Sequence, residues 1–253
     1  MMTASEIIGY MESLRNEKQR QVLMSFFKTG PGQYGEGDEF LGLKVPQTRE
    51  VVKLAVADTP LDEVPQLLMS RWHEVRLCGL LMLVDKFGKL ATKRLANDEA
   101  AIDGRDAIVA MYLKHAEQAN NWDLVDLSAP KILGHWLLLP TRLGDKRKTF
   151  DALAASPCLW KQRMSIVCTW KTSQLGDASW CLRYAEVHLH HPHDLMHKAV
   201  GWMLREMGKR VSMDLLRDFL HQHVREMPRT ALRYAIEKMD DEERQYWMNI
   251  PNK

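Results

Sequence analysis

The chain has 253 residues, which at roughly 100 to 200 residues per domain suffices for one large domain or two small ones. Apolar residues make up 45% of the chain and charged residues 27%, which excludes disorder, collagen and coiled coil as the main architecture. Lys and Arg number 35 against 33 Asp and Glu, so the net charge is +2. This balance permits a polyanionic partner without demanding one, and any basic face must come from where the charges lie.

The cysteines and the apolar runs predict a cellular location. The four cysteines form neither a C-x-x-C pair nor a disulfide framework, which is typical of a reducing compartment. The first residues carry charge early and lack the apolar stretch of a signal peptide. The longest apolar run, from Leu77 to Val84, is far too short to cross a bilayer. We therefore expect a cytoplasmic protein without a membrane partner.

Apolar residues recur with the helical period almost everywhere, and the alternation typical of strands is almost absent. Ile7 and Phe26 belong to an opening helical region. A loop rich in glycine and acidic residues follows, from Thr29 to Asp38. Val45 then begins a helix with Pro46 in its first turn.

A repeated pattern follows: a polar helix, a short turn, and an apolar helix that opens with a charged residue. We predict these apolar helices over residues 74–87, 121–137, 160–173, 197–210 and 228–239. Equivalent positions in them are 50, 37, 35 and 31 residues apart, namely Arg76, Asp126, Arg163, Lys198 and Arg229. Such spacing is typical of degenerate two-helix repeats. The fold predicted is an all-α HEAT/armadillo-like helical-repeat solenoid with a concave binding face, in a single domain over residues 1–253.

The loop contains a G-x-G-x-x-G match at Gly30, Gly32 and Gly35. A dinucleotide fingerprint needs a strand before it and a helix that begins inside it, and both are missing. We interpret the loop as a flexible surface segment. A loop whose bare backbone approaches a ligand stays open as the alternative.

A histidine-rich segment runs from His188 to His197. His193 and His197 are four residues apart, but H-E-x-x-H is absent and Pro192 interrupts the cluster. We therefore predict a turn that leads into a helix capped near Asp194, with no metal site. G-x-S-x-G, the signature of many serine hydrolases, is also absent.

The segment NNWDLVDLSAP carries more information. Asn120 or Asn121 can cap a helix on which Trp122 and Asp126 lie one turn apart on the same face. An ordinary structural interpretation is open too, with Trp122 in the core and Asp126 paired with an arginine. Corresponding helix starts elsewhere offer another indole and several cations, which favours a site on the concave face. These residues are Arg163, Trp202, Arg205, Lys209 and Arg229.

Several motifs together resemble a known family. The segments are FLGLKVPQTR, WDLVD, LWKQR, KAVGWMLRE and PRTALRYAIEKM, in this order between about residues 20 and 240. The chain resembles the DNA alkylation repair proteins of the AlkD-like group, which are HEAT-repeat DNA glycosylases that excise positively charged alkylated purines. The resemblance implies a monofunctional glycosylase that acts as a monomer on double-stranded DNA containing alkylated bases, of the 7-methylguanine and 3-methyladenine type.

The resemblance also implies residue roles. Asp126 and Trp122 look like the catalytic carboxylate and indole, Trp202 like the second aromatic of the cleft, and Arg163 like the arginine that grips the DNA backbone beside the lesion. Arg205, Lys209 and Arg229, with Lys28 and Lys44, would contact phosphates. The family acts from the backbone side of the lesion, so bulky adducts would be tolerated, and no cofactor is needed.

Two departures from the family pattern are present. The Thr29–Asp38 loop is an insertion, and Phe26 stands where some relatives have a tyrosine that packs against DNA. A non-catalytic HEAT-repeat module that binds damaged or branched DNA is therefore the main alternative. A protein-interaction scaffold is the third, and it would lack clustered cations.

Overall fold

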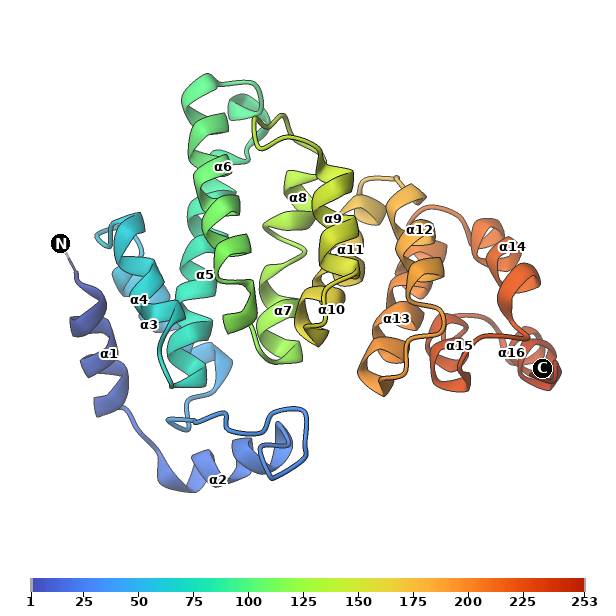
Figure 1. Ribbon diagram of the computed structural model, residues 1–253, viewed down its shortest axis with the longest axis horizontal. Coiled ribbons are helices and arrows are strands. Elements are labelled where there is room, and N and C mark those ends of the chain that lie inside the picture. Colours follow the sequence, from blue (N-terminus) through green and yellow to red (C-terminus); the bar gives the residue numbers. More distant parts are fainter. Residues whose placement is uncertain (1, 253) are drawn as a thin grey trace. The chain divides into compact units, whose positions relative to one another are not determined.

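The computed structural model describes residues 2–252, which form helices joined by turns and loops (Figure 1). Within this range there is no β-strand, only an isolated bridge between Glu39 and Trp72. The chain divides into two compact units. Unit 1 comprises Met1–Ser128 and Leu139–Gly144, and unit 2 comprises Ala129–Leu138 and Asp145–Lys253. The interpretation of residues 1–253 as one domain, and the concave face, stay predictions.

Unit 1 is built around one long apolar helix, α5. It packs against α3, α4, α6 and α7, and its residues from His73 to Leu83 are all buried. The helices of this unit are α1 (Ala4–Ser13), α2 (Glu17–Phe26), α3 (Val45–Ala55), α4 (Val64–Leu68), α5 (His73–Leu90), α6 (Glu99–Lys114) and α7 (Trp122–Ser128). Short 3₁₀ turns lie at Leu61–Glu63, Lys93–Leu95 and Ala116–Gln118.

Local sequence signals explain where these helices begin. Thr3 and Glu6 form a capping box at α1, and Asp98 accepts the Ala101 N–H at the start of α6. Pro46 lies in the first turn of α3, where its missing N–H costs nothing, as predicted.

Unit 2 is organised around α13 (Asp194–Arg210), which packs against α10, α11, α12, α14 and α15. A Cβ on Gly201 would lie 2.3 Å from the Ala231 carbonyl oxygen, so glycine is what permits the close packing of α13 on α15. The other helices are α8 (Leu133–Trp136), α9 (Lys146–Ala154), α10 (Leu159–Val167), α11 (Thr169–Gln174), α12 (Ser179–Val187), α14 (Met213–His223), α15 (Arg229–Ala235) and α16 (Asp241–Asn249).

Two of the predicted helices are each divided in two. Residues 121–137 form α7 and α8 with turns between them, because Pro130 lacks an N–H and cannot continue the α7 hydrogen-bond ladder. Residues 160–173 form α10 and α11, which meet at Cys168. The remaining apolar repeats correspond to α5, α13 and α15.

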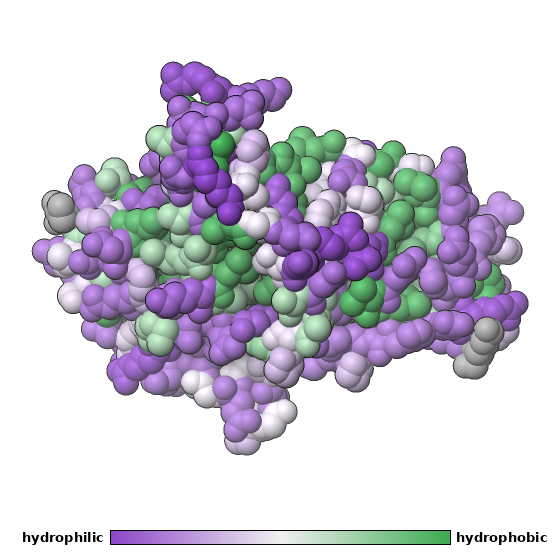
Figure 2. Space-filling view, turned by 45° about the horizontal axis from the view of Figure 1, so that its top comes forward, coloured by the Kyte–Doolittle hydropathy of each residue, from purple (hydrophilic) through white to green (hydrophobic). Residues whose placement is uncertain are grey.

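The packing pattern identifies the fold class. Helices contact mainly those next or next but one along the chain, such as α4 with α5, α9 with α10 and α13 with α15. The all-α helical-repeat fold is therefore confirmed. Hydrophilic side chains cover most of the surface seen in Figure 2, with apolar ones in patches between them. None of the helices between residues 2 and 252 has the length and apolar character needed to cross a membrane.

Candidate functional site

The start of α7 presents an indole and a carboxylate. Asn121 precedes the helix, and its side-chain oxygen accepts the Trp122 N–H at 2.9 Å while its carbonyl accepts the Val125 N–H at 3.2 Å. The helix thus begins directly after the predicted pair Asn120–Asn121, and which asparagine caps it stays a prediction. Trp122 and Asp126 are both half-buried and lie one turn apart, so they project from the same side of α7.

Trp122 is supported by the phenylalanine pair at the end of α2. Its ring centroid lies 5.3 Å from that of Phe27 and 5.9 Å from that of Phe26, the latter in an edge-on arrangement. Phe27 is buried, whereas Phe26 is 58% exposed. The three rings form an aromatic wall that reaches solvent at Phe26.

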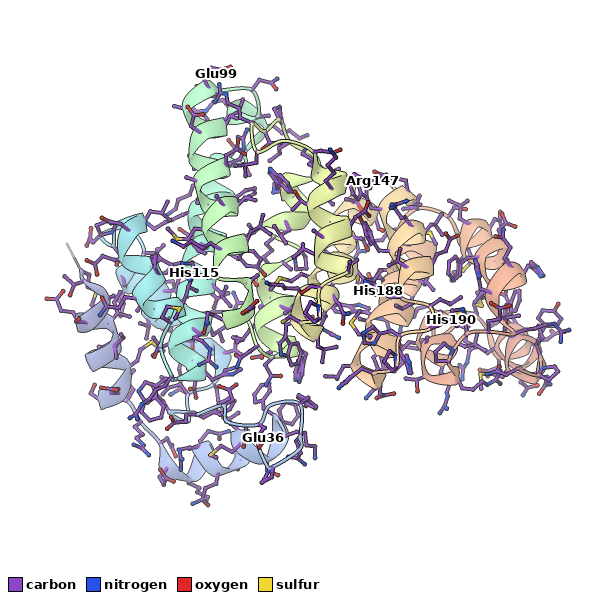
Figure 3. All side chains as sticks on the ribbon, viewed as in Figure 1. Glu36, Glu99, His115, Arg147, His188 and His190 are labelled. Carbon is purple, nitrogen blue, oxygen red and sulfur yellow. The ribbon has the colours of Figure 1, made fainter. Side chains whose placement is uncertain are left out.

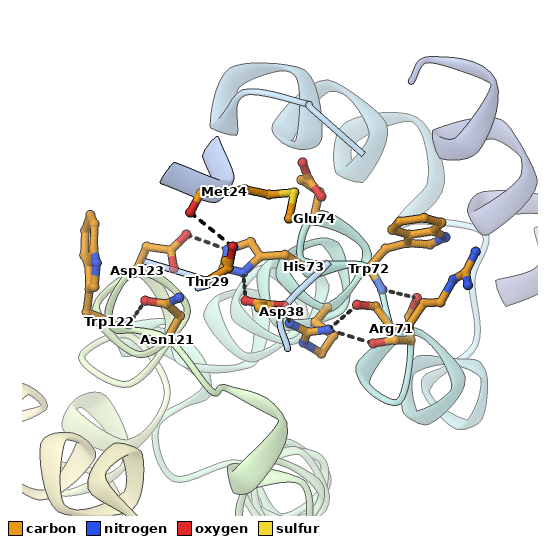
Figure 4. A network of polar contacts seen from close by, with 12 residues as sticks. Met24, Thr29, Asp38, Arg71, Trp72, His73, Glu74, Asn121, Trp122 and Asp123 are labelled. Carbon is orange, nitrogen blue, oxygen red and sulfur yellow. Dashed lines mark hydrogen bonds and ion pairs between the residues drawn. The ribbon is translucent and has the colours of Figure 1, made fainter. Parts of the chain in front are cut away.

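Asp123, next to Trp122, points into the protein and joins a buried polar chain (Figure 4). Its Oδ2 lies 2.9 Å from Nε2 of His73, the first residue of α5. Nδ1 of the same imidazole lies 2.7 Å from Oδ2 of Asp38, at the end of the glycine-rich loop. The other Asp38 oxygen accepts from the Arg76 guanidinium. All four side chains are buried.

The charges in this buried polar chain determine the protonation of the His73 imidazole. Burial alone would lower the pKa of the imidazole, but the Asp123 carboxylate, and then Asp38, outweigh it and raise the pKa to about 9. Burial would raise the pKa of Asp38, yet His73 and Arg76 hold it below its usual value. At neutral pH the His73 imidazole is therefore protonated and the Asp38 carboxyl is ionised.

The loop between α2 and α3 is anchored at several points. Glu74 accepts the backbone N–H groups of Leu41, Gly42 and Leu43 at 2.8 to 3.0 Å. Arg76 donates to the carbonyl oxygens of Ser70 and Arg71 in addition to Asp38. Side chains of α5 therefore hold the chain from Asp38 to Leu43, whereas the flexibility predicted for the glycine-rich segment before Asp38 stays a prediction.

The tip of the loop makes its own contacts. The Gly32 N–H donates to Glu36 at 2.8 Å, and Glu36 lies on the loop beyond α2 (Figure 3). Gly35 is buried, and a Cβ there would lie 2.4 Å from the Phe27 carbonyl oxygen. A helix, α2, precedes this loop and no strand does, as expected. The G-x-G-x-x-G match is thus not a dinucleotide fingerprint.

The other predicted site residues belong to unit 2. Arg163, on α10, is buried and donates to the Leu195 carbonyl oxygen in the first turn of α13 at 2.6 Å. Trp202 is half-buried on α13. Trp122 and Asp126 lie together on α7 of unit 1, and their approach to Arg163 and Trp202 stays a prediction.

The predicted phosphate-binding cations differ in their partners. Arg205 pairs with Glu237 and Glu206. Arg229 donates to the carbonyl oxygens of Ile250 and Met248, which follow or end α16. Three lysines, by contrast, are exposed and form no ion pair among residues 2–252: Lys28, Lys44 and Lys209. These lysines are the predicted cations most available to a polyanion.

The histidine-rich segment forms a structured turn between α12 and α13. His193 Nδ1 accepts the Leu195 N–H and so caps α13, one residue before the predicted cap. His191 Nδ1 accepts the His193 N–H. His188 is buried against Ser165, whereas His190 is exposed (Figure 3). Throughout residues 2–252, no group of three or more His, Cys, Asp or Glu side chains is placed to hold a metal ion.

The family model described as DNA alkylation repair enzyme matches residues 7–239, which is nearly the whole chain. The chain belongs to the DNA alkylation repair enzyme family. The matched range covers most of both units and includes Trp122, Asp126, Arg163 and Trp202.

A solved structure of a predicted DNA alkylation repair enzyme from Enterococcus faecalis is similar in fold. The TM-score is 0.68 at 15% identity, over 90% of this chain and 97% of that one. A search of curated proteins finds no match.

The buried polar chain beside α7 was not predicted from the sequence. His73 and Glu74 are charged or polar residues at the start of a long, largely buried helix, which is a signal of burial with partners. Their partners lie between α2 and α3 and on α7, far away in the sequence. No local pattern indicates those pairings.

Proposed function

We propose that this chain is a DNA glycosylase that excises positively charged alkylated purines, of the 7-methylguanine and 3-methyladenine type, by hydrolysing the N-glycosidic bond. The observation that supports this function is the pairing of Trp122 and Asp126 on one face of α7. Both side chains are half-buried, which leaves part of each open to solvent. Membership of the DNA alkylation repair family provides the context.

The chemistry needs a carboxylate. Alkylation at N7 or N3 makes the purine cationic and a good leaving group, so departure of the base builds positive charge on the deoxyribose. A carboxylate close to C1′ stabilises this oxocarbenium-like charge and orients a water molecule for attack. Asp126 supplies this group in our proposal.

Aromatic faces complement the same charge. An indole attracts a cation through its π face by about 0.5 to 2 kcal/mol, depending on desolvation. Trp122 is the first such face, and its packing on Phe27 limits its rotation. Trp202 of unit 2 is proposed as the second, and Arg163 as the group that grips the backbone beside the lesion.

The test is a mass-spectrometric base-release assay on methylated duplex DNA. We expect the wild type to release 7-methylguanine or 3-methyladenine, and Asp126→Asn to slow release by about 10²- to 10³-fold because the developing charge loses its counter-charge. DNA affinity should change little. Asp62→Asn, which alters an exposed carboxylate on the Leu61–Glu63 turn, serves as the matched control and should keep full activity.

Two results would contradict the proposal. Full activity in Asp126→Asn would remove the assigned mechanism. Salt-sensitive DNA binding by the wild type without any base release would instead identify the non-catalytic DNA-binding module.

A further inference from the structure

The imidazole of His73 connects two segments that are distant in sequence. Its Nδ1 lies 2.7 Å from Oδ2 of Asp38, at the end of the loop, and its Nε2 lies 2.9 Å from Oδ2 of Asp123, on α7. Both contacts are buried, and His73 is only 2% exposed. A protonated imidazole donates through both nitrogens, so one side chain satisfies a carboxylate on each side.

Aromatic rings enclose the same imidazole. Phe40 stacks on it with centroids 4.4 Å apart, and Phe27 lies at 5.0 Å. Phe27 also contacts Trp122 at 5.3 Å. The surroundings of His73 are thus Asp38 and Phe40 from the loop, Phe27 from the end of α2, and Asp123 from α7. Arg76, one turn along α5, reaches the far oxygen of Asp38.

This arrangement determines how α7 is oriented. Residues on an α-helix are separated by about 100° around its axis, so fixing the direction of Asp123 also fixes the directions of Trp122 and Asp126. Since α7 has only seven residues, a single buried contact in its first turn constrains the whole element. The loop adds a second constraint, because a Cβ on Gly35 would lie 3.3 Å from the Asn121 side chain, which shows how closely the loop backbone approaches the start of the helix.

We propose that His73 is a positioning residue: by bridging Asp38 and Asp123 it locks the glycine-rich loop to α7 and holds Trp122 and Asp126 in their reactive orientation. This inference rests on the proposed glycosylase function for its catalytic part. His73 does not touch the reacting atoms; it acts through Asp123.

The decisive variant is His73→Gln, compared with Glu74→Gln. Glutamine cannot bridge two carboxylates as a cation, so the tie between loop and helix is lost. Glu74 is the adjacent buried residue and anchors residues 41–43, but it contacts neither Asp38 nor Asp123 through a hydrogen bond. We expect His73→Gln to lower the single-turnover rate of base release by roughly 10- to 100-fold, since small misplacements of catalytic groups are costly. The Kd for DNA should stay within about twofold, and Glu74→Gln should keep the wild-type rate.

The pH profile separates positioning from general stability. The wild-type single-turnover rate should fall as the pH rises through about 9, where His73 loses its proton. His73→Gln should lack this limb. If His73→Gln does not fold, Asp123→Ala cuts the same tie while leaving Asp38 paired with His73 and Arg76, and it should slow the reaction similarly. Equal rates for Glu74→Gln and for either His73→Gln or Asp123→Ala would overturn the proposal.

Hydrogen–deuterium exchange at neutral pH tests the lock without catalysis. In His73→Gln, residues 28–38 and 121–128 should lose protection together, whereas in Glu74→Gln the segment 121–128 should stay protected. Exchange that stays at the wild-type level in both segments of His73→Gln would overturn the lock. If residues 28–38 and 121–128 lose protection together in His73→Gln but the wild type releases no base, the glycosylase function is refuted and the lock stands.

Discussion

Two buried histidines show how partners determine protonation at the scale of single residues. His73 lies between two carboxylates, which outweigh burial and raise its pKa to about 9. His188 is bonded to the Ser165 hydroxyl, and burial, with the nearby His191, lowers its pKa to about 4. The fold therefore stabilises the charged form of one imidazole and the neutral form of the other.

A pH dependence of stability follows for His73. Because its folded pKa is above the ordinary value of 6.5, its contribution is fully present below about pH 6.5 and is lost as the pH rises through about 9. A shift of this size corresponds to about 3 kcal/mol of unfolding free energy. Urea denaturation of the wild type between pH 6 and 10 should show this decline, and His73→Gln should be less stable at neutral pH but lack the alkaline decline.

His188→Gln is the matched control for this measurement. His188→Gln should retain the alkaline decline in unfolding free energy and lack the decline that the wild type shows on the acid side. The neutral His188 of the folded state resists protonation, so wild-type stability should fall as the pH decreases from about 6.5 toward about 4. An alkaline decline of equal size in His73→Gln would contradict the assignment.

At the scale of elements, the glycine-rich loop is held by its second half. Asp38 and Gly35 are buried, while Pro31, Gly32 and Gln33 are exposed. The loop is therefore an anchored support for α7 at one end and an exposed tip at the other.

Two glycines of this loop should respond differently to the same substitution. A Cβ on Gly35 would meet two backbone oxygens, of Phe27 at 2.4 Å and Lys28 at 3.1 Å, so Gly35→Ala must displace the loop and should cost about 1 to 3 kcal/mol. A Cβ on Gly30 would meet only the movable Gln33 side chain, at 3.1 Å. Gly30→Ala should therefore change stability by less than about 0.5 kcal/mol. Thermal unfolding of the two variants makes the comparison, and similar melting temperatures would refute a tightly packed Gly35.

At the scale of the whole molecule, the modest net charge of +2 makes DNA affinity depend on a few available cations. Arg205 and Arg229 are engaged within the protein, by carboxylates and by backbone carbonyls respectively. Lys28, Lys44 and Lys209 are exposed, and each lies in a different loop, cap or helix end.

Salt dependence of DNA binding tests these lysines. Each phosphate contact that is lost should make the log–log slope of affinity against salt shallower by about 0.9 on duplex DNA. We expect this change for Lys28→Ala and Lys44→Ala, measured by fluorescence anisotropy across a salt series. Lys53→Ala removes an exposed lysine that already pairs with Glu50 and should leave the slope unchanged. Unchanged slopes in all three variants would exclude Lys28 and Lys44 from the DNA contact.

The amino-acid sequence alone was sufficient to predict the fold class and to place Trp122 and Asp126 on the same face of a helix. Both depend on helical periodicity, and residues four apart on a helix share a face whatever surrounds them. The bridge from Asp38 through His73 to Asp123 could not be predicted from the sequence, because His73 is 35 residues from Asp38 and 50 residues from Asp123. The same holds for Arg229, whose carbonyl acceptor at Ile250 is 21 residues away. Such contacts depend on which segments packing brings together, and only the tertiary structure decides that.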